Sequence, residues 1–314
     1  MNWKRLVRHE TILALLVLLA LFVLDRQSDK FFTLDNLFNQ GRLMTEVGLV
    51  AIVMTFVIIT GGIDLSVGSI LGMTAILIGV FWKNLGLPLS VAIGLGLVVG
   101  TLAGVVNGII ITRFRVPPLI ATLGTLALYR GIAEGVSQAR SVRGYPEWFY
   151  VLGQGQLLGV PTQLWIFGIA AVVAAALLGW TTCGRTTYAI GSNEVAARFS
   201  GLSVDVTKVA IYAASGLAAA VAAAIFVSRV STTRSDMGTG IELDAITAVV
   251  LGGTSIFGGR GTIVGTLLGL VLIQALKNGL SLAGVKSDGT VVLIGAVLIL
   301  TILLSNLFHR DQNR

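Results

Sequence analysis

The sequence contains one cysteine, two histidines and few charged residues, and each of these scarcities excludes a class of protein. Cys183 has no partner for a disulfide within the chain, and His9 and His309 lie at opposite ends, so neither residue type forms a metal-binding cluster. Charged residues make up only 12% of the 314 residues, hydrophobic residues make up 55%, and the mean hydropathy is +0.90. These values lie far outside soluble protein usage and indicate a polytopic membrane protein.

Motifs for catalysis and for ATP binding are also missing. The sequence has no G-x-S-x-G, no H-E-x-x-H and no Cys/His pair that could serve as a nucleophile and base. The run 258–261, GGRG, resembles a phosphate-binding loop only superficially, because no Gly-Lys dipeptide occurs to supply a Walker A lysine. We therefore expect a passive protein that is not an enzyme and that binds no cofactor or metal.

The net charge of +7 and the thirty-nine glycines fit a tightly packed membrane bundle. Basic residues are scattered among apolar spans, so we expect the lipid bilayer, not nucleic acid, to be their counterpart. Small residues let membrane helices approach closely. The predicted fold is all-α, a single transmembrane domain over 1–314. Its ten spans, several of them short or broken, are expected at about 11–25, 44–60, 69–82, 88–111, 119–139, 163–180, 208–228, 243–257, 262–280 and 290–307.

Lys and Arg in short loops favour an orientation with both termini in the cytoplasm. Ten basic residues then face the cytoplasm and nine face the opposite side, where most of the acidic residues also lie. This orientation places the polar interval Gly184–Lys208, GRTTYAIGSNEVAARFSGLSVDVTK, in the cytoplasm.

A short helix is predicted over 193–200, inside that polar interval. Ser192 is positioned to be its N-cap, Glu194 lies in the first turn where the helix dipole favours an anion, and Gly201 can end it. The predicted helix is about 12 Å long at ~1.5 Å per residue.

The spacing gives this helix two distinct sides. Val195, Phe199 and Leu202 share an apolar side, while Glu194 and Arg198 are spaced as an i,i+4 ion pair. An apolar stripe outside the membrane either packs back on its own protein or docks a partner, and the spacing alone leaves both interpretations open.

Two stretches interrupt the apolar runs with glycine. Thr60–Gly72, TGGIDLSVGSILG, and Leu251–Gly269, LGGTSIFGGRGTIVGTLLG, each carry a Gly-Gly pair and then enter another apolar run. Matching interruptions in the two halves of a transporter point to a transport pathway built from broken helices. Asp64 places a carboxylate at membrane depth, which is costly unless it is paired or hydrated. It either belongs to a polar pathway or, with Ser66, caps a helix that starts near Val67.

Other polar groups within the spans allow two interpretations. Arg130 and Glu134 are four apart and are expected to pair with each other. Amides such as Asn107 either hydrogen-bond a hydroxylated solute or hold helices together. The candidate pathway residues are Thr60, Gly61, Gly62, Asp64, Ser66, Asn107, Thr254, Ser255, Gln274 and Asn278.

The chain carries four motifs in this order: TGGIDLSVGSILG, VNGIIITRFRVPPLIATLGTL, GRTTYAIGSNEVAARFSGLSV, and ITAVVLGGTSIFGGRGTIVGTLLG with QALKNGLSLAGV. Together they resemble the permease subunit of bacterial ABC importers for sugars, the group that contains the ribose permease. The resemblance runs from about Glu46 to Leu282. It implies a multi-pass subunit of the bacterial inner membrane that works with a second permease copy or close homologue, two cytoplasmic ATPases and a periplasmic sugar-binding protein. The stretch SRVSTTRSDMGTGIELDAI is also similar to permeases for rhamnose and for autoinducer-2.

By the same resemblance, GSNEVAARFSGLSV at 191–204, within the cytoplasmic coupling loop 184–208, corresponds to the coupling helix that docks into the ATPase. The coupling residues it implies are Arg185, Ser192, Asn193, Glu194, Val195, Ala196, Arg198, Phe199 and Gly201. The alternative function is an ion-coupled secondary transporter of a small polar solute, for which broken helices and Asp64 would also serve. That alternative requires no ATPase and leaves the predicted cytoplasmic helix unexplained. The solute, and the choice between a homodimer and a heterodimer of permeases, stay open.

Overall fold

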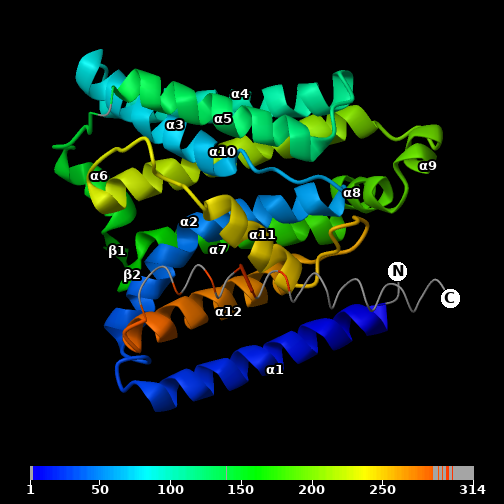
Figure 1. The fold of residues 1–314 in the computed structure, drawn as a ribbon, viewed down its shortest axis with the longest axis horizontal. Coiled ribbons are helices and arrows are strands. Elements are labelled where there is room, and N and C mark those ends of the chain that lie inside the picture. The colour runs from blue at the N-terminus through cyan, green and yellow to red at the C-terminus, as the bar shows by residue number, and fades with distance from the viewer. Residues whose placement is uncertain are drawn as a thin grey trace.

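The computed structural model describes residues 3–138 and 140–285 and five isolated positions between 289 and 299. It is a bundle of long helices, as predicted, with one short two-stranded hairpin (Figure 1). Seven segments are long and apolar enough to cross a membrane. They are α2 (Leu34–Ile59), α3 (Val67–Gly79) with the π-helical turn η1 (Val80–Asn84), α4 (Leu89–Arg113), α5 (Pro118–Ser137), α7 (Thr162–Trp180), α10 (Val204–Val230) and α12 (Ile263–Leu282).

Shorter elements lie at the two ends and in the middle of the bundle. They are α6 (Glu147–Gly153), β1 (Gln156–Leu157), β2 (Val160–Pro161), α8 (Thr182–Ser192), α9 (Glu194–Phe199) and α11 (Ile241–Leu251). Helix α1 (Trp3–Gln27) packs along α12 at one edge. We call the end that carries α8 and α9 the α9 end, and the opposite end, which carries α6 and the β1–β2 hairpin, the α6 end (Figure 1).

Several predicted spans need correction. The predicted span 44–60 begins ten residues too late, because Thr33 caps α2 by accepting a hydrogen bond from the Asn36 N–H at 3.4 Å. The predicted span 243–257 is wrong, since α11 has 11 residues, whereas a spanning helix needs about 20. The polar interval 184–208 contains part of α8 as well as the expected short helix. The predicted span 290–307 lies outside the continuously described residues.

The core of the bundle is built around α10, which packs against α4, α2 and α3. Four of its alanines, Ala219, Ala220, Ala222 and Ala223, are fully buried, and a Cβ added at Gly216 would overlap the carbonyl oxygen of Gly100 on α4. A Cβ at Gly104 would likewise overlap the carbonyl oxygen of Tyr212. The backbones of α4 and α10 therefore touch, which explains why small residues, glycine in α4 and alanine in α10, are abundant in these two spans.

Two non-helical segments run into the bundle. Segment 60–66 leaves the α9 end of α2 and returns to the middle before α3 begins at Val67, and segment 231–240 enters from the α6 end before α11 (Figure 1). A Cβ at Gly238 would lie 2.6 Å from the carbonyl oxygen of Gly68, so the beginnings of α3 and α11 meet inside the bundle.

The two glycine-rich interruptions found in the sequence lie in different places. Segment 60–66 runs to the start of α3 in the middle of the bundle, whereas 252–262 connects α11 to α12 at the α9 end (Figure 1). The sequence where α11 begins, GIELD at 240–244, is similar to GIDLS at 62–66, just before α3. The starts of α3 and α11 thus lie next to each other and carry similar sequences.

Candidate functional site

Helix α9 is a single rigid turn-and-a-half with a defined start and end. Its N-cap is Asn193, whose side chain accepts from the Ala196 N–H at 2.9 Å. The prediction of Ser192 as N-cap is wrong, because Ser192 is the last residue of α8 and donates to the Tyr188 carbonyl oxygen at 2.9 Å. The end is as predicted: Gly201 has a φ of +79°, which a residue with a Cβ rarely adopts.

The closing turn of α9 has the Schellman hydrogen bonds. The Gly201 N–H donates to Arg198 O at 3.1 Å, and the Leu202 N–H donates to Ala197 O at 3.2 Å. These bonds satisfy two carbonyl groups that the helix end would leave free. The α9 backbone is therefore held at both ends by local contacts.

Four charged side chains fasten α9 to the start of α10. Arg198 pairs with Glu194 at 3.2 Å, as predicted, and also makes a two-pronged contact with Asp205 at 2.7 and 2.9 Å. Lys208 reaches Glu194 at 2.5 Å. Burial alone would raise the pKa of Glu194, but its bonds to Lys208 and Arg198 outweigh burial, so its pKa is lowered.

The apolar residues of this region divide between two faces. Ala197 is buried with Ile190 and Val204, and Leu202 packs against them, so Leu202 does not share the outward face that the spacing predicted. Phe199 is 90% exposed and Val195 is 63% exposed. Among the other predicted coupling residues, Arg185 and Ala196 are exposed as well. Helix α9 thus presents an apolar surface, Val195 and Phe199, away from the described protein.

Helix α8 is in direct contact with both the end of α2 and the 252–262 connection. A Cβ at Gly191 would overlap the carbonyl oxygen of Ile59, the last residue of α2. That oxygen accepts from the Gly259 N–H at 2.9 Å, and the Tyr188 hydroxyl donates to Gly261 O at 2.7 Å. Any displacement of α8 must therefore move the point where α2 ends.

Asp64 lies at the centre of a buried hydrogen-bond network. Its Oδ1 accepts from the Ser66 N–H at 3.0 Å and from Ser66 Oγ at 2.6 Å, and its Oδ2 accepts from Ser215 Oγ of α10 at 2.8 Å. Asn107 of α4 donates to Ser66 Oγ at 2.7 Å. Asp64, Ser66 and Asn107 are each 0% exposed. The network binds the 60–66 segment to two neighbouring helices. Helix α3 begins at Val67, as predicted, but the capping interpretation is wrong for Ser66, because its side chain makes no capping hydrogen bond and is taken up by Asp64 and Asn107.

Arg130 does not pair with Glu134. Its guanidinium donates to three backbone carbonyl oxygens: that of Ser235, that of Met237 at 3.0 Å and that of Gly68 at 3.3 Å. Glu134 is exposed. The prediction fails because non-helical segments leave carbonyl groups unpaired inside the bundle, and a guanidinium with five donors can satisfy several of them.

The remaining predicted pathway residues lie in three separate places. Thr60, Gly61 and Gly62 form the turn after α2, with Gly61 at a φ of +77°. Thr254 and Ser255 lie buried in the 252–262 connection. Gln274 and Asn278 bridge α12 to α2 through Gln40 at 2.6 Å and Asn36 at 3.0 Å. None of these residues lines either of the two cavities described below, and their role in a pathway stays a prediction.

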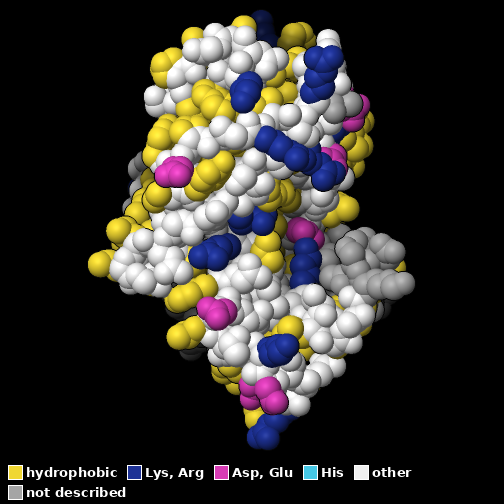
Figure 2. Space-filling model, turned by 90° about the vertical axis from the view of Figure 1, so that its left-hand side faces the viewer, with side chains coloured by type: hydrophobic (Ala, Val, Ile, Leu, Met, Phe, Trp, Pro, Cys, Tyr) yellow, Lys and Arg dark blue, Asp and Glu magenta, His cyan; other side chains and the backbone are white. Residues whose placement is uncertain are grey.

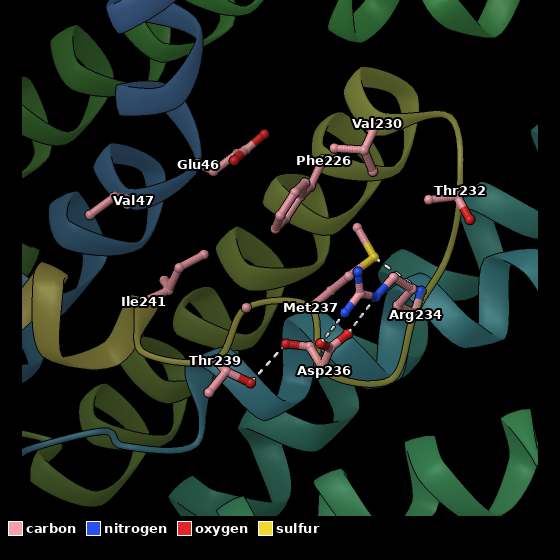
Figure 3. A pocket seen from close by; sticks show the side chains of 11 residues that line it. Glu46, Val47, Phe226, Val230, Thr232, Arg234, Asp236, Met237, Thr239 and Ile241 are labelled. Carbon is pink, nitrogen blue, oxygen red and sulfur yellow. Dashed lines mark hydrogen bonds and ion pairs between the residues drawn. The ribbon is translucent and has the colours of Figure 1, made fainter. Parts of the chain in front are cut away.

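A cavity of about 400 Å³ opens at the α6 end between α2, α10 and segment 231–240 (Figure 3). Glu46 and Phe226 line it from the two helices, and Thr232, Arg234, Asp236 and Thr239 line it from the segment. Lys and Arg side chains, with fewer Asp and Glu, are spread over this end of the molecule (Figure 2). Within the described ranges, no group of three or more His, Cys, Asp or Glu residues could hold a metal ion.

Sequence reasoning did not find these cavity residues. Glu46 belongs to a predicted span, and segment 231–240 was noted only as part of a resemblance. One signal was present: three threonines, at 232, 233 and 239, an arginine at 234 and an aspartate at 236 gather in a short connection. Such a composition is typical of a polar loop that enters a bundle and lines a water-filled space.

Comparison with known proteins shows which family the chain belongs to. A family model described as "Branched-chain amino acid transport system / permease component" matches residues 36–302. The ribose import permease protein RbsC of Escherichia coli K12 is 41% identical over 310 residues, which cover 96% of this chain and 94% of that protein. RbsC of Bacillus subtilis 168 is 44% identical over 271 residues, covering 86% and 84%.

A third relative carries a different name. The autoinducer 2 import system permease protein LsrD of Yersinia enterocolitica is 38% identical over 309 residues, covering 96% of this chain and 93% of that protein. No solved structure gave a significant match. The family match over most of the chain and the seven apolar helices together identify a multi-pass membrane protein. The chain belongs to the family of transport-system permease components.

Proposed function

We propose that this chain is the translocation subunit of an ATP-driven importer for a sugar or sugar-like solute in the bacterial inner membrane. Its relatives are import permeases named for ribose and for autoinducer 2. In this proposal ATP is hydrolysed by two separate cytoplasmic chains, a periplasmic binding protein delivers the solute, and a second permease completes the pathway. The α9 end faces the cytoplasm.

The exposed surface of α9 is the observation that carries the coupling part of the proposal. Phe199 and Val195 project from a helix whose ends and charged side are already fixed by contacts with α8 and α10. An exposed apolar surface on a rigid mount is suited to dock a partner. We assign that partner as the ATPase, and Gly184–Lys208 as the coupling segment.

The contacts of α8 with the end of α2 and with the 252–262 connection could transmit a displacement of α9 into the bundle. When the ATPase pair closes, a rigid-body displacement of α9 carries α8 with it. Gly191 then shifts against Ile59 and Gly259, which lie at the end of α2 and in the α11–α12 connection. The buried network of Asp64 and Ser66, which follows the end of α2, receives that displacement.

Phe199→Asp tests the docking surface. Because Phe199 is 90% exposed, the substitution should leave the permease folded and inserted, yet it places a charge in the apolar contact. We expect the amount of ATPase that co-purifies, and ATP-driven uptake, to fall at least about tenfold, the effect of ~1.4 kcal/mol on binding. Arg198→Glu, which opposes Glu194 and Asp205, should act in the same direction.

Phe32→Asp is the matched control, since Phe32 is an exposed phenylalanine (49%) that packs edge-on against Phe31 away from α9. It should leave ATPase association unchanged. Normal co-purification and uptake in Phe199→Asp would refute the assignment of α9. Uptake that follows an imposed ion gradient in vesicles without an ATPase would instead support the alternative, a secondary transporter.

A further inference from the structure

The cavity at the α6 end has the size and the lining of a small-molecule site. Its volume of about 400 Å³ falls within the ~300–1,000 Å³ that ligand sites usually have. We propose that this cavity is a binding site on the permease itself for a neutral, polyhydroxylated solute. The proposal rests on the proposed function and adds to it a place where the solute first contacts this chain.

The charged groups at the cavity compensate one another. Glu46 is 4% exposed and is bound by Arg229 of α10 through two hydrogen bonds, at 2.7 and 2.9 Å. Asp236 is bound by Arg234 in the same two-pronged way, at 2.9 and 2.5 Å (Figure 3). Neither carboxylate is left to pair with an ammonium group of a ligand. Each carboxylate oxygen still has a lone pair to accept from a hydroxyl group.

The rest of the wall combines apolar surface with hydroxyl groups. Phe226, Val47 and Ile241 can cover the carbon side of a ring, and the Arg229 guanidinium, 4.8 Å from the centre of the Phe226 ring, fixes its position. Thr232 and Thr239 supply the hydroxyl groups of the wall, and the Thr232 Oγ1 atom is buried beneath its surface, without a hydrogen-bond partner among the described residues.

A second cavity at the same end has a different character. It measures about 490 Å³ and is lined by Lys83, Arg140 and Arg143 with no acidic residue among its lining groups. Uncompensated cations favour an anion. Of the two cavities, only the one around Glu46 and Asp236 matches the charge of a neutral sugar.

Thiol protection tests the site directly. The full-length chain is placed in lipid nanodiscs with its single cysteine removed by Cys183→Ser, and Thr239→Cys then introduces one thiol at the exposed rim of the cavity. We expect D-ribose or L-rhamnose at high millimolar concentration to slow maleimide labelling at least about threefold, as for a site two-thirds occupied. Labelling of Leu157→Cys, an exposed position on the β1–β2 hairpin, should not change.

A second variant tests an acceptor of the cavity. Asp236→Ala removes a carboxylate that can accept from a solute hydroxyl, so the sugar concentration that gives half-protection should rise about fivefold, the value of one hydrogen bond. Asp29→Ala, at an exposed carboxylate in the α1–α2 connection, is the control and should leave that concentration unchanged.

The outcomes separate the site from the proposed function. If a sugar is imported in an ATP-dependent manner yet none of the sugars slows labelling of Thr239→Cys, the cavity proposal is overturned and the proposed function stands. Protection by L-leucine without protection by either sugar also overturns it. If the assembled system imports neither sugar, the result counts against the substrate class in the proposed function, and not only against this cavity.

Discussion

Segment 60–66 and connection 252–262 are both rich in glycine, yet the protein holds them in different ways. The first runs through the middle of the bundle, where Asp64, Ser66, Ser215 and Asn107 fix it through buried side-chain hydrogen bonds. The second lies at the α9 end, where backbone groups such as the Gly259 N–H contact α2 and α8. One interruption depends on polar side chains, and the other depends on the absence of side chains.

This difference follows from the surroundings of each segment. Deep in a membrane bundle no water satisfies backbone and hydroxyl groups, so polar side chains must do so. At the end of the bundle the requirement is close approach of three chain segments, which only glycine allows. Gly258 and Gly259 have φ values of +85° and +72°, conformations that residues with a Cβ rarely adopt. Substitutions that break the two segments should therefore differ in kind.

Asp64→Ala should have the largest effect on stability. The change removes the acceptor of three buried hydrogen bonds and leaves Ser66 and Ser215 unsatisfied, which we expect to destabilise the fold by roughly 3 kcal/mol. Thermal unfolding of the detergent-solubilised protein measures the loss. Asp29→Ala, at an exposed carboxylate in the α1–α2 connection, is the control. An unchanged unfolding temperature for Asp64→Ala would mean that the hydrogen-bond network does not stabilise the fold.

Gly191→Ala should have the next largest effect and should act through packing. The new Cβ would overlap the Ile59 carbonyl oxygen and crowd the Gly259 N–H, so α8 must shift away from α2, at a cost of about 2 kcal/mol. Gly168→Ala, on α7 with open space around it, should be neutral or stabilising by ~0.5 kcal/mol. Equal unfolding temperatures for both variants would contradict the close contact between α8 and the end of α2.

Local features of α9 could be predicted from the sequence. The short helix, the Glu194–Arg198 pair and the end at Gly201 follow from rules that act within a few residues, and the structure confirms them. The N-cap was missed by one position, because Ser192 and Asn193 are both good caps and tertiary packing extends α8 through Ser192. Local rules identify the element but not the exact boundary.

Long-range partners could not be predicted. The carbonyl groups bound by Arg130 lie 62 to 107 positions away in sequence, so the nearby Glu134 seemed the natural partner. The cavity depends on Glu46 and Arg229, which are 183 positions apart. The length of α11 was misjudged because the apolar run continues past its end through Ile256 and Phe257, although Gly252 and Gly253 already stop the helix.

Glu194→Gln should have the smallest effect on stability. It tests whether charged side chains hold α9 in place, as buried polar groups hold the 60–66 segment. The pKa of Glu194 in the folded protein is below its ordinary value of 4.5. Stability from this group is therefore present above pH 4.5 and is lost as the pH falls through the lowered folded-state pKa. Because the Glu194 side chain is 42% exposed, we expect its ion pairs to contribute only about 0.5 kcal/mol to stability.

Hydrogen exchange at the backbone amides of 194–205 measures this contribution, with exchange rates corrected for their intrinsic pH dependence. In the native protein, protection of these amides should be higher at pH 6 than at pH 3.5, whereas in Glu194→Gln it should be lower at pH 6 and should change less with pH. Amides of α10 near Ala222 and Ala223, which are fully buried, serve as the internal control. Equal pH dependence in both proteins would mean that the caps at Asn193 and Gly201, not the ion cluster, hold α9 in place.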